Sequence, residues 1–351
     1  MKKLLIIILL GGLAAVASLP GCKPDPSIDI AAPDTSLNIS FTVPDGWPQP
    51  AYTFTNNTLT QAGFELGRKL FYDTRLSKDN TISCGSCHQQ FAAFAHLDHN
   101  VSHGIHDLLG TRNTPALFNM AWQSSFFWDG GVTNIENQPI NPMQNPVEMD
   151  QPVTEAINKL SADEQYRSMF NTAFGSDTIN SQRIFKALAQ FMAAMVSDNS
   201  KYDKYIRGES GGELTAQELS GLSLFRLKCG NCHPEPLFTD DKFHNDGLTL
   251  DPTFNDTGRI RITGNTQDRY KFKVPSLRNV ARSAPYMHDG RFSTLDAVLE
   301  HYRSGIYVWH NADPLLRQNI GMSEQDKADI IAFLNTLTDE TFLHDPRFSE
   351  Q

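Results

Sequence analysis

The chain has 351 residues, of which 40% are hydrophobic and 20% are charged, and its formal net charge is −10. This composition is that of a folded globular protein, and the length suffices for about two domains. An acidic chain is a poor candidate for binding nucleic acid, so we expect no such partner. A charged protein partner should be basic on its docking face, although the negative charge could equally serve solubility alone.

The first 21 residues (1–21) have the order of a secretory signal peptide: two lysines, a short apolar run, and small residues before Gly21 and Cys22. A retained transmembrane anchor is the weaker alternative, because the run is shorter than the roughly 20 residues that span a bilayer. The Gly-Cys pair resembles a bacterial lipobox, with Cys22 as the acylated first residue of the mature protein. Prolines among small polar residues predict a tether over 22–55. We therefore expect a periplasmic protein anchored to a membrane by lipid.

Several segments have the apolar spacing of amphipathic helices. They cover 59–71, 182–195, 215–225 and a segment that starts at Ser323 and reaches Leu334. The third opens with the capping box Thr215-x-x-Glu218. Strand patterns are few, which predicts a mainly α-helical fold. The glycine-rich break at 208–212 suggests a boundary between an N-terminal domain over 56–207 and a C-terminal domain over 208–345.

Apart from Cys22, the cysteines form two C-x-x-C-H motifs. These are Cys84-Gly85-Ser86-Cys87-His88 and Cys229-Gly230-Asn231-Cys232-His233. The spacing lets both thiols add to the vinyl groups of one porphyrin while the next imidazole binds the iron. A zinc site or a thioredoxin-like pair would leave the histidine after each pair unexplained. We therefore predict two tandem cytochrome c-like domains, each with one covalent c-type haem, and with His88 and His233 as proximal iron ligands.

Longer motifs surround both sites. They are L-F-Y-D-T-R-L-S (70–77), R-N-T-P (112–115), F-W-D-G (127–130), N-P-V-E-M (145–149), F-K-V-P-S-L-R-N-V (272–280) and A-P-Y-M-H-D-G-R-F (284–292). Together they resemble the bacterial dihaem cytochrome c peroxidases and their MauG-type branch across nearly all of 59–337. The resemblance implies reduction of hydrogen peroxide with electrons from a small cytochrome c or a copper protein. The resemblance also suggests that the protein can form a homodimer.

The resemblance implies catalytic roles for three residues. Glu148 would move protons above the first, peroxidatic haem, Trp128 would couple the two haems, and Gln138 would be a polar residue of the distal pocket. On the residues alone, Glu148 could be a surface glutamate at a loop end. Trp128 could likewise be ordinary aromatic packing.

The resemblance also implies a calcium ion between the domains. Asn113, Ser283 and Pro285 match the positions that bind it, the last two through backbone carbonyls. Ser283 replaces the family's usual threonine, which should matter little for a carbonyl ligand.

One departure concerns the loop over 101–107. In the family's peroxidases a loop histidine binds the peroxidatic iron in the resting enzyme. Here His106 or His103 could serve, and the neighbouring glycine favours His106. A solvated histidine with no iron contact is an equal alternative. His96 and His99 lie nearby without a role from the resemblance.

The other departure concerns the second haem, where the family's peroxidases place a methionine as distal ligand. The corresponding residue here is Tyr302, with Met287 and Met322 as alternative ligands and a buried, hydrogen-bonded tyrosine as a further alternative. Tyrosine resembles the MauG-type branch, because an anionic oxygen ligand stabilises ferric iron. Two other functions therefore stay open: peroxide-dependent oxidation of a protein or organic substrate, and pure electron transfer.

Overall fold

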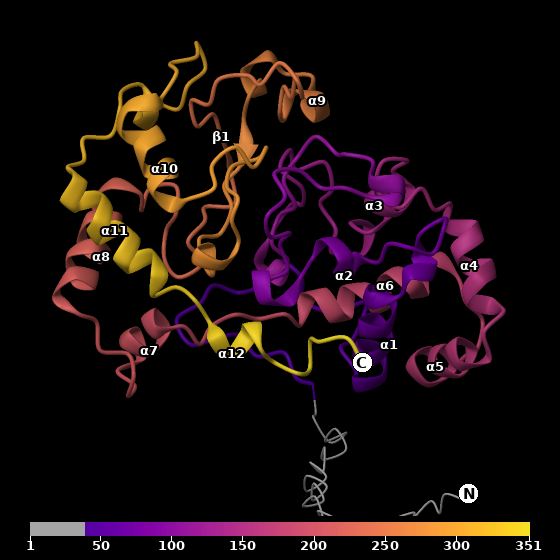
Figure 1. The fold of residues 1–351 in the computed structure, drawn as a ribbon. Helices are drawn as coiled ribbons and strands as arrows, with labels where there is room; N and C mark the ends of the chain where they lie inside the picture. Colours follow the sequence, from indigo (N-terminus) through magenta and orange to yellow (C-terminus); the bar gives the residue numbers. More distant parts are fainter. Residues whose placement is uncertain (1–38) are drawn as a thin grey trace, which may run out of the picture. The chain divides into compact units, whose positions relative to one another are not determined.

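The protein is represented by a computed structural model that describes residues 39–351, which belong to one compact unit (Figure 1). The predicted signal peptide, Cys22 and the first part of the tether lie outside the described residues. Within 39–351 the structure is mainly helical, as predicted, and two short strands, β1 (Phe243–His244) and β2 (Phe272–Lys273), pair antiparallel. No helix in this part of the chain has the length and apolar composition needed to span a membrane.

The helices are joined by irregular connections that range from short turns to long loops. In chain order they are α1 (Gln61–Tyr72), α2 (Cys84–Cys87), α3 (Ile140–Gln144), α4 (Val153–Ser161), α5 (Glu164–Phe174), α6 (Ser181–Ala193), α7 (Lys201–Arg207), α8 (Ala216–Lys228), α9 (Ile260–Thr263), α10 (Leu295–Glu300), α11 (Glu324–Asn335) and α12 (Glu340–Leu343). The helices predicted from apolar spacing are confirmed as α1, α6, α8 and α11. Thr60, Thr215 and Ser323 cap three of them by accepting a first-turn backbone N–H.

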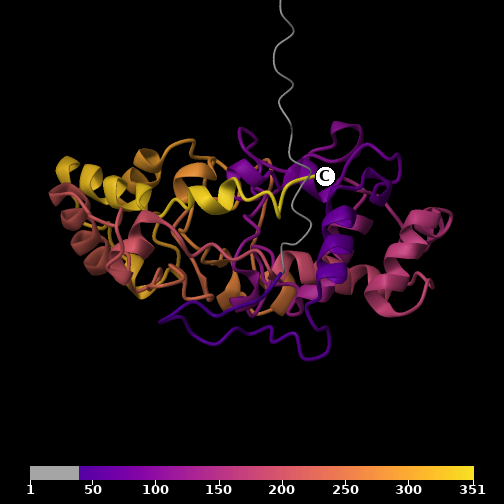
Figure 2. The same cartoon turned by 90° about the horizontal axis from the view of Figure 1, so that it is seen from below.

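The first hydrophobic core is built on the packing of α1 against α6 (Figure 2). Leu66 and Leu70 of α1 and Phe191 of α6 are fully buried in it. A Cβ at Gly67 would lie 2.0 Å from the carbonyl oxygen of Ala187, so only glycine allows this close approach. The spacing of apolar residues therefore brings two helices distant in sequence into one core.

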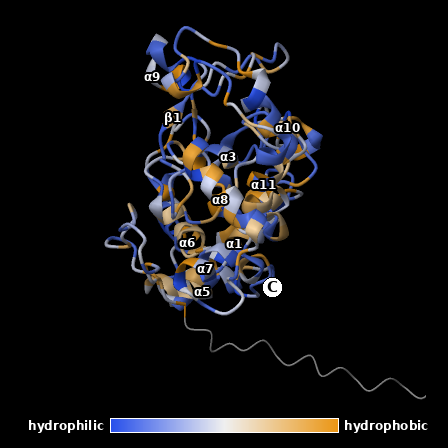
Figure 3. Ribbon diagram, turned by 90° about the vertical axis from the view of Figure 1, so that its left-hand side faces the viewer, coloured by the Kyte–Doolittle hydropathy of each residue, from blue (hydrophilic) through white to orange (hydrophobic). Residues whose placement is uncertain are grey.

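The second core repeats this arrangement with α8 and α11, whose apolar residues are orange in Figure 3. Phe225 and Phe333 are buried where the helices cross, and a Cβ at Gly221 would lie 1.9 Å from the carbonyl oxygen of Asp329. The chain changes from the first core to the second between Val196 and Tyr202. This change comes a few residues before the boundary expected at 208.

Residues 39–54 form an irregular segment with a turn at 45–46 that packs on the first core, which differs from the free tether that their prolines predicted. Trp47 and Trp122 pack edge to face at 5.0 Å, and the Trp122 indole N–H donates to the Pro48 carbonyl at 2.8 Å. The Tyr52 backbone N–H donates to the carbonyl of Ala121 at 2.9 Å. Aromatic side chains set between the prolines explain the difference, because they bury apolar surface on the first core.

The C-terminal segment leaves the second core and returns to the first (Figures 1 and 2). Phe342 and Phe348 belong to the first core, and the Tyr72 hydroxyl donates to the carbonyl of Phe348 at 2.6 Å. The described chain therefore crosses between the two cores twice.

Candidate functional site

The first C-x-x-C-H motif lies on α2, a single turn that holds both Cys84 and Cys87. The Nδ1 atom of the following His88 lies 2.7 Å from the carbonyl oxygen of Phe94. Since a carbonyl can only accept, Nδ1 carries the hydrogen and Nε2 is left to bind a metal. Burial lowers the pKa of His88 to about 4, which keeps the imidazole neutral, as an iron ligand must be.

The second motif follows α8 and has the same geometry. The Nδ1 atom of His233 lies 2.9 Å from the carbonyl oxygen of Phe238, and burial lowers the pKa of this histidine as well. Phe94 and Phe238 both have left-handed backbone conformations, with φ of 58° and 55°. Each motif therefore ends in a turn that directs a carbonyl at its histidine.

All four cysteines of the motifs are free thiols. Burial raises the pKa of Cys84 and of Cys229 to about 12, and of Cys87 and Cys232 to about 11. No disulfide links either pair in the described part of the chain, so both sulfurs of each motif fit bonds to a porphyrin.

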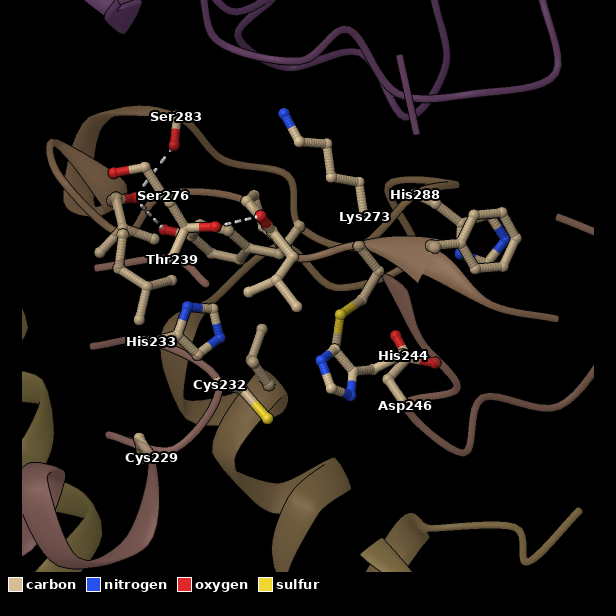
Figure 4. A pocket seen from close by; sticks show the side chains of 18 of the residues that line it. Cys229, Cys232, His233, Thr239, His244, Asp246, Lys273, Ser276, Ser283 and His288 are labelled. Carbon is tan, nitrogen blue, oxygen red and sulfur yellow. Dashed lines mark hydrogen bonds between the residues drawn. The ribbon is translucent and has the colours of Figure 1, made fainter. Parts of the chain in front are cut away.

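A cavity of about 540 Å³ adjoins the second motif (Figure 4). Cys229, Cys232 and His233 line it together with apolar residues of α8, α10 and α11. Its size lies within the range of cofactor sites, roughly 300–1,000 Å³. The residues present therefore fit a covalently held haem.

Tyr302 lines the same cavity. It lies on a π-helical turn, His301–Gly305, that directly continues α10, and such turns are frequent at functional sites. Burial raises its pKa well above the usual value, so the hydroxyl is held in its neutral form unless a metal binds it.

Most of the other predicted site residues reach this cavity from the two halves of the chain. They are Asn113, Trp128, Gln138, Ser283 and Pro285. The Trp128 indole N–H donates to the carbonyl of Asn113 at 2.9 Å, which fixes the plane of the ring. Calcium binding by Asn113, Ser283 and Pro285 stays a prediction.

Glu148 lies on the side of the first motif, where its charge raises the pKa of Cys87. Burial raises the pKa of Glu148 itself, although the Asn145 amide opposes this by donating to Oε1 at 2.8 Å. The Glu148 carbonyl accepts from the Ile105 backbone N–H at 2.8 Å, and a Cβ at Gly104 would lie 2.1 Å from that oxygen. The glutamate and the loop over 101–107 therefore form one wall beside the first motif.

The two candidate loop histidines differ in position. The His106 side chain is 70% exposed and lies 3.8 Å from the carboxylate of Asp79. The His103 side chain is 27% exposed, and its backbone carbonyl accepts from the Cys87 thiol at 3.4 Å. The geometry thus favours His103 as the loop histidine nearer the first motif, whereas the neighbouring glycine had favoured His106. Iron ligation by either residue stays a prediction.

The two tandem units predicted from the sequence also correspond in detail, beyond the haem motifs themselves. Segment 113–132 matches segment 273–292 at a constant separation of 160 positions, with shared proline, leucine, asparagine and Asp-Gly positions. The Asn113 backbone N–H donates to the His288 carbonyl at 2.7 Å, and the Lys273 N–H donates to the Trp128 carbonyl at 2.8 Å. The two donors, Asn113 and Lys273, occupy equivalent positions in the two segments, and so do the two acceptors, Trp128 and His288. The halves therefore meet through reciprocal, pseudo-twofold contacts.

A guanidinium clamp crosses the same contact. Arg112 donates to Asp129 and to Asp256 at 2.5 Å each, and its guanidinium lies 5.9 Å from the ring centroid of Phe272. Burial opposes ionisation of Asp256, but the hydrogen bond and the charge of Arg112 lower its pKa below the usual range. Charge thus joins the two halves beside the reciprocal backbone bonds.

Comparison with known proteins assigns the family. The model of the di-haem cytochrome c peroxidases matches residues 61–211. The methylamine utilization protein MauG of Methylorubrum extorquens is 34% identical over 344 residues, which cover 95% of this chain and 93% of the relative. The chain belongs to the di-haem cytochrome c peroxidase family. Membership implies two haems, and one haem for each C-x-x-C-H motif stays a prediction.

Two further relatives place it within that family. The cytochrome c551 peroxidase of Nitrosomonas europaea is 34% identical across 78% of this chain and 79% of its own length. A MauG-like protein associated with microbial copper homeostasis superposes with a TM-score of 0.80 at 35% identity, over 88% of this chain and 98% of that structure. Peroxidases and MauG-like enzymes are therefore both among the similar members of the di-haem peroxidase family.

Proposed function

We propose that this chain reduces hydrogen peroxide to two waters with two electrons and two protons, and that Glu148 is its proton-transfer group. The observation that supports this best is a partly buried glutamate with a raised pKa in the wall beside the first haem motif. Perturbed carboxylates of this kind are typical of general acid–base catalysts. The haems, when bound, supply the iron at which peroxide reacts and the route for electrons.

The side chains then have distinct tasks. The ionised Glu148 accepts a proton from the peroxide oxygen next to the first motif and returns it to the departing oxygen, and the Asn145 amide orients the carboxylate. Trp128 lies with its ring fixed by the bond to Asn113, which suits electron coupling between the halves. His88 and His233 would hold their irons through Nε2, because Nδ1 of each donates to a backbone carbonyl.

The test is stopped-flow absorbance of the dihaem protein mixed with hydrogen peroxide, in the oxidised and half-reduced states. Glu148→Gln keeps the shape of the side chain and its contact to Asn145, but removes the proton acceptor. We expect peroxide-dependent haem oxidation to slow by about 10²–10⁴-fold. The wild-type rate should also rise with pH as Glu148 ionises, above the usual range for a glutamate because burial raises its pKa.

The matched control is Glu155→Gln, which removes an exposed carboxylate from the first turn of α4. Its peroxide rate should equal that of the wild type. Equal rates for Glu148→Gln and wild type would remove Glu148 from the mechanism, and no reaction in either redox state would overturn the peroxidase itself.

A second candidate function is peroxide-dependent oxidation of a protein or organic substrate. Tyr302, which lines the cavity at the second motif, favours it. Phenolate ligation would stabilise ferric iron in the second haem and favour storage of oxidising equivalents. Two of the relatives similar to this chain are named MauG. Reaction of the fully oxidised protein with peroxide, together with little turnover of a reduced small cytochrome c, would support this function over the peroxidase.

Tyr302→Met separates the two functions. Methionine ligation raises haem potentials, and axial ligands together set them over about 0.8 V. We therefore expect the second haem of the variant to reduce at a higher potential, and its reaction with peroxide to require prior reduction. A redox titration followed by absorbance measures the first effect, and an unchanged midpoint would show that Tyr302 is not an iron ligand.

The cellular setting completes the proposal. Export, lipidation at Cys22 and a periplasmic location follow from the N-terminal sequence, and calcium at Asn113, Ser283 and Pro285 follows from the family resemblance. The electron donor would be a small cytochrome c or copper protein. Labelling with a radioactive fatty acid in cells that express Cys22→Ala, compared with wild type, tests the anchor.

A further inference from the structure

Three histidines converge in the loop that follows the first haem motif, and neither the proposed reaction nor the family resemblance uses them together. They are His96, His99 and His103. One ligand nitrogen from each lies within 4.8 Å of the others. Their ring centroids are 4.1 Å, 4.9 Å and 4.6 Å apart. Such a group is already close to the arrangement of ligands around a single ion.

The buried member of the group has an unsatisfied nitrogen. His96 is 3% exposed, and among the described residues nothing bonds to its Nδ1 atom. A buried polar atom without a partner destabilises the folded state, so its presence needs an explanation. A cation bound at Nδ1 would supply the missing partner.

His99 is arranged in the way that metal ligands usually are. Its Nδ1 lies 3.0 Å from the carbonyl oxygen of Leu97, which therefore accepts a hydrogen bond from it and leaves Nε2 free. The side chain is exposed, so its ring can turn to shorten the nitrogen separations toward those of a bound ion. Exposure also gives the ion a path of entry and leaves a coordination position for water.

We propose that His96, His99 and His103 bind one transition-metal cation of the zinc or copper type, in addition to the two haem irons. Neutral imidazoles suit Zn²⁺ and copper, whereas calcium and magnesium prefer oxygen ligands. Three protein nitrogens and one water give the four-coordinate geometry of zinc, with Zn–N distances of about 2.0–2.1 Å. The proposed calcium site nearby is different in kind, because it uses the oxygens of Asn113, Ser283 and Pro285.

The position of the loop suggests what the ion does. The Asn113 amide donates to the carbonyls of His99 at 3.3 Å and Asn100 at 3.2 Å. On the other side, a Cβ at Gly290 of the second half would lie 2.0 Å from the Asn100 carbonyl oxygen. The loop is therefore wedged into the contact between the halves, and an ion that ties its two ends together would stabilise that contact.

The test uses the dihaem protein with both haems attached, stripped with a chelator and then dialysed against micromolar ZnCl₂ or, separately, CuSO₄. Elemental analysis then gives zinc or copper relative to iron. We expect about one added ion for every two haem irons, together with a higher midpoint of thermal unfolding. In His99→Ala the affinity for the metal ion should fall by more than about 100-fold. Even the loss of a residue that only hydrogen-bonds to a ligand lowers metal affinity by about 10–100-fold.

The control is His344→Ala, which removes an exposed imidazole near the C-terminus and should leave the added ion in place. Because His99 is exposed, its variant should fold, and an unchanged haem content checks this. An equal metal content in wild type and His99→Ala would overturn the proposal. So would the absence of zinc and copper from the wild type, and in that case loss of a low-spin signal in His103→Ala would assign His103 to the haem iron instead.

Discussion

The two halves of the molecule hold their haem motifs alike but face them with different residues. In each half the histidine of the motif is oriented by a carbonyl from a phenylalanine in left-handed conformation. The wall near the first motif carries Glu148, the proposed proton-transfer group, whereas the cavity at the second motif carries Tyr302, a candidate iron ligand. A duplicated frame would thus hold the two cofactors alike, and under the proposed function a few side chains opposite them would divide the chemistry.

The contact between the halves shows the same mixture of symmetry and departure from it. Backbone bonds from Asn113 and Lys273 are reciprocal, but the positions before them, Arg112 and Phe272, are not equivalent in chemistry. The Arg112 guanidinium lies over the ring of Phe272, the residue at the equivalent position, and also forms an ion pair with Asp256. The symmetric bonds set the register of the two halves, and we expect the asymmetric clamp to carry more of the stability.

The largest effect on stability is expected from Arg112→Met. Methionine fills much of the same space but leaves two carboxylates, of Asp129 and Asp256, without their shared partner. Removing one member of a buried ion pair costs about 3–5 kcal/mol, because the remaining charge stays desolvated. Urea unfolding of the dihaem protein measures this loss.

The control is Arg226→Met, which breaks a surface pair with Glu235 in which the arginine side chain is 53% exposed. Exposed pairs contribute about 0–1 kcal/mol. If the two variants lose similar amounts of stability, the clamp is no stronger than a surface ion pair and the symmetric backbone bonds hold the halves together.

A smaller effect should separate the matched glycines Gly130 and Gly290. Both have positive φ, 69° and 66°, so alanine costs about 1–2 kcal/mol at either position. At Gly290 the new Cβ would also lie 2.0 Å from the Asn100 carbonyl oxygen, whereas at Gly130 the nearest atoms belong to the side chains of Phe243 and Arg259. Gly290→Ala should therefore unfold at a lower temperature than Gly130→Ala, and the reverse order would show that side-chain crowding matters more than backbone contact.

Much of the fold could be predicted because it is encoded locally. The helix starts at Thr60, Thr215 and Ser323 follow from a capping side chain and the apolar spacing behind it. The packing of Trp47 on Trp122 and the return of Phe348 to the first core could not be predicted, since they join segments far apart in sequence.

The site shows the same division. The C-x-x-C-H motifs predict the haem ligands on their own, because covalent haem attachment needs that spacing. The equivalence of Trp128 and His288 is also present in the sequence, since the two segments align when the chain is compared with itself at a shift of 160 positions. The predictions above did not use this signal. The convergence of His96, His99 and His103 depends on the path of an irregular loop, which no periodicity describes.

The smallest expected effect on stability is that of Glu148→Gln. Unlike the preceding substitutions, which should destabilise the protein, this one should stabilise it slightly at pH 7. Burial raises the folded-state pKa of Glu148, so the folded protein favours its protonated form. The stability that this group contributes is fully present below the unfolded pKa of about 4.3 and is lost as pH rises through the folded pKa. At pH 7 the partly buried Glu148 therefore lowers the stability of the folded protein.

Glu148→Gln removes that destabilisation and keeps an oxygen for the Asn145 amide. At pH 7 the variant should unfold at or slightly above the wild-type temperature, and the difference should shrink toward zero near pH 4. Thermal unfolding at both pH values, on the same protein used for stopped flow, measures it. If Glu148→Gln loses activity but gains stability, the wild-type glutamate serves the reaction and not the fold. If the variant loses both activity and stability, Glu148 supports the wall beside the first motif, and another group moves the proton.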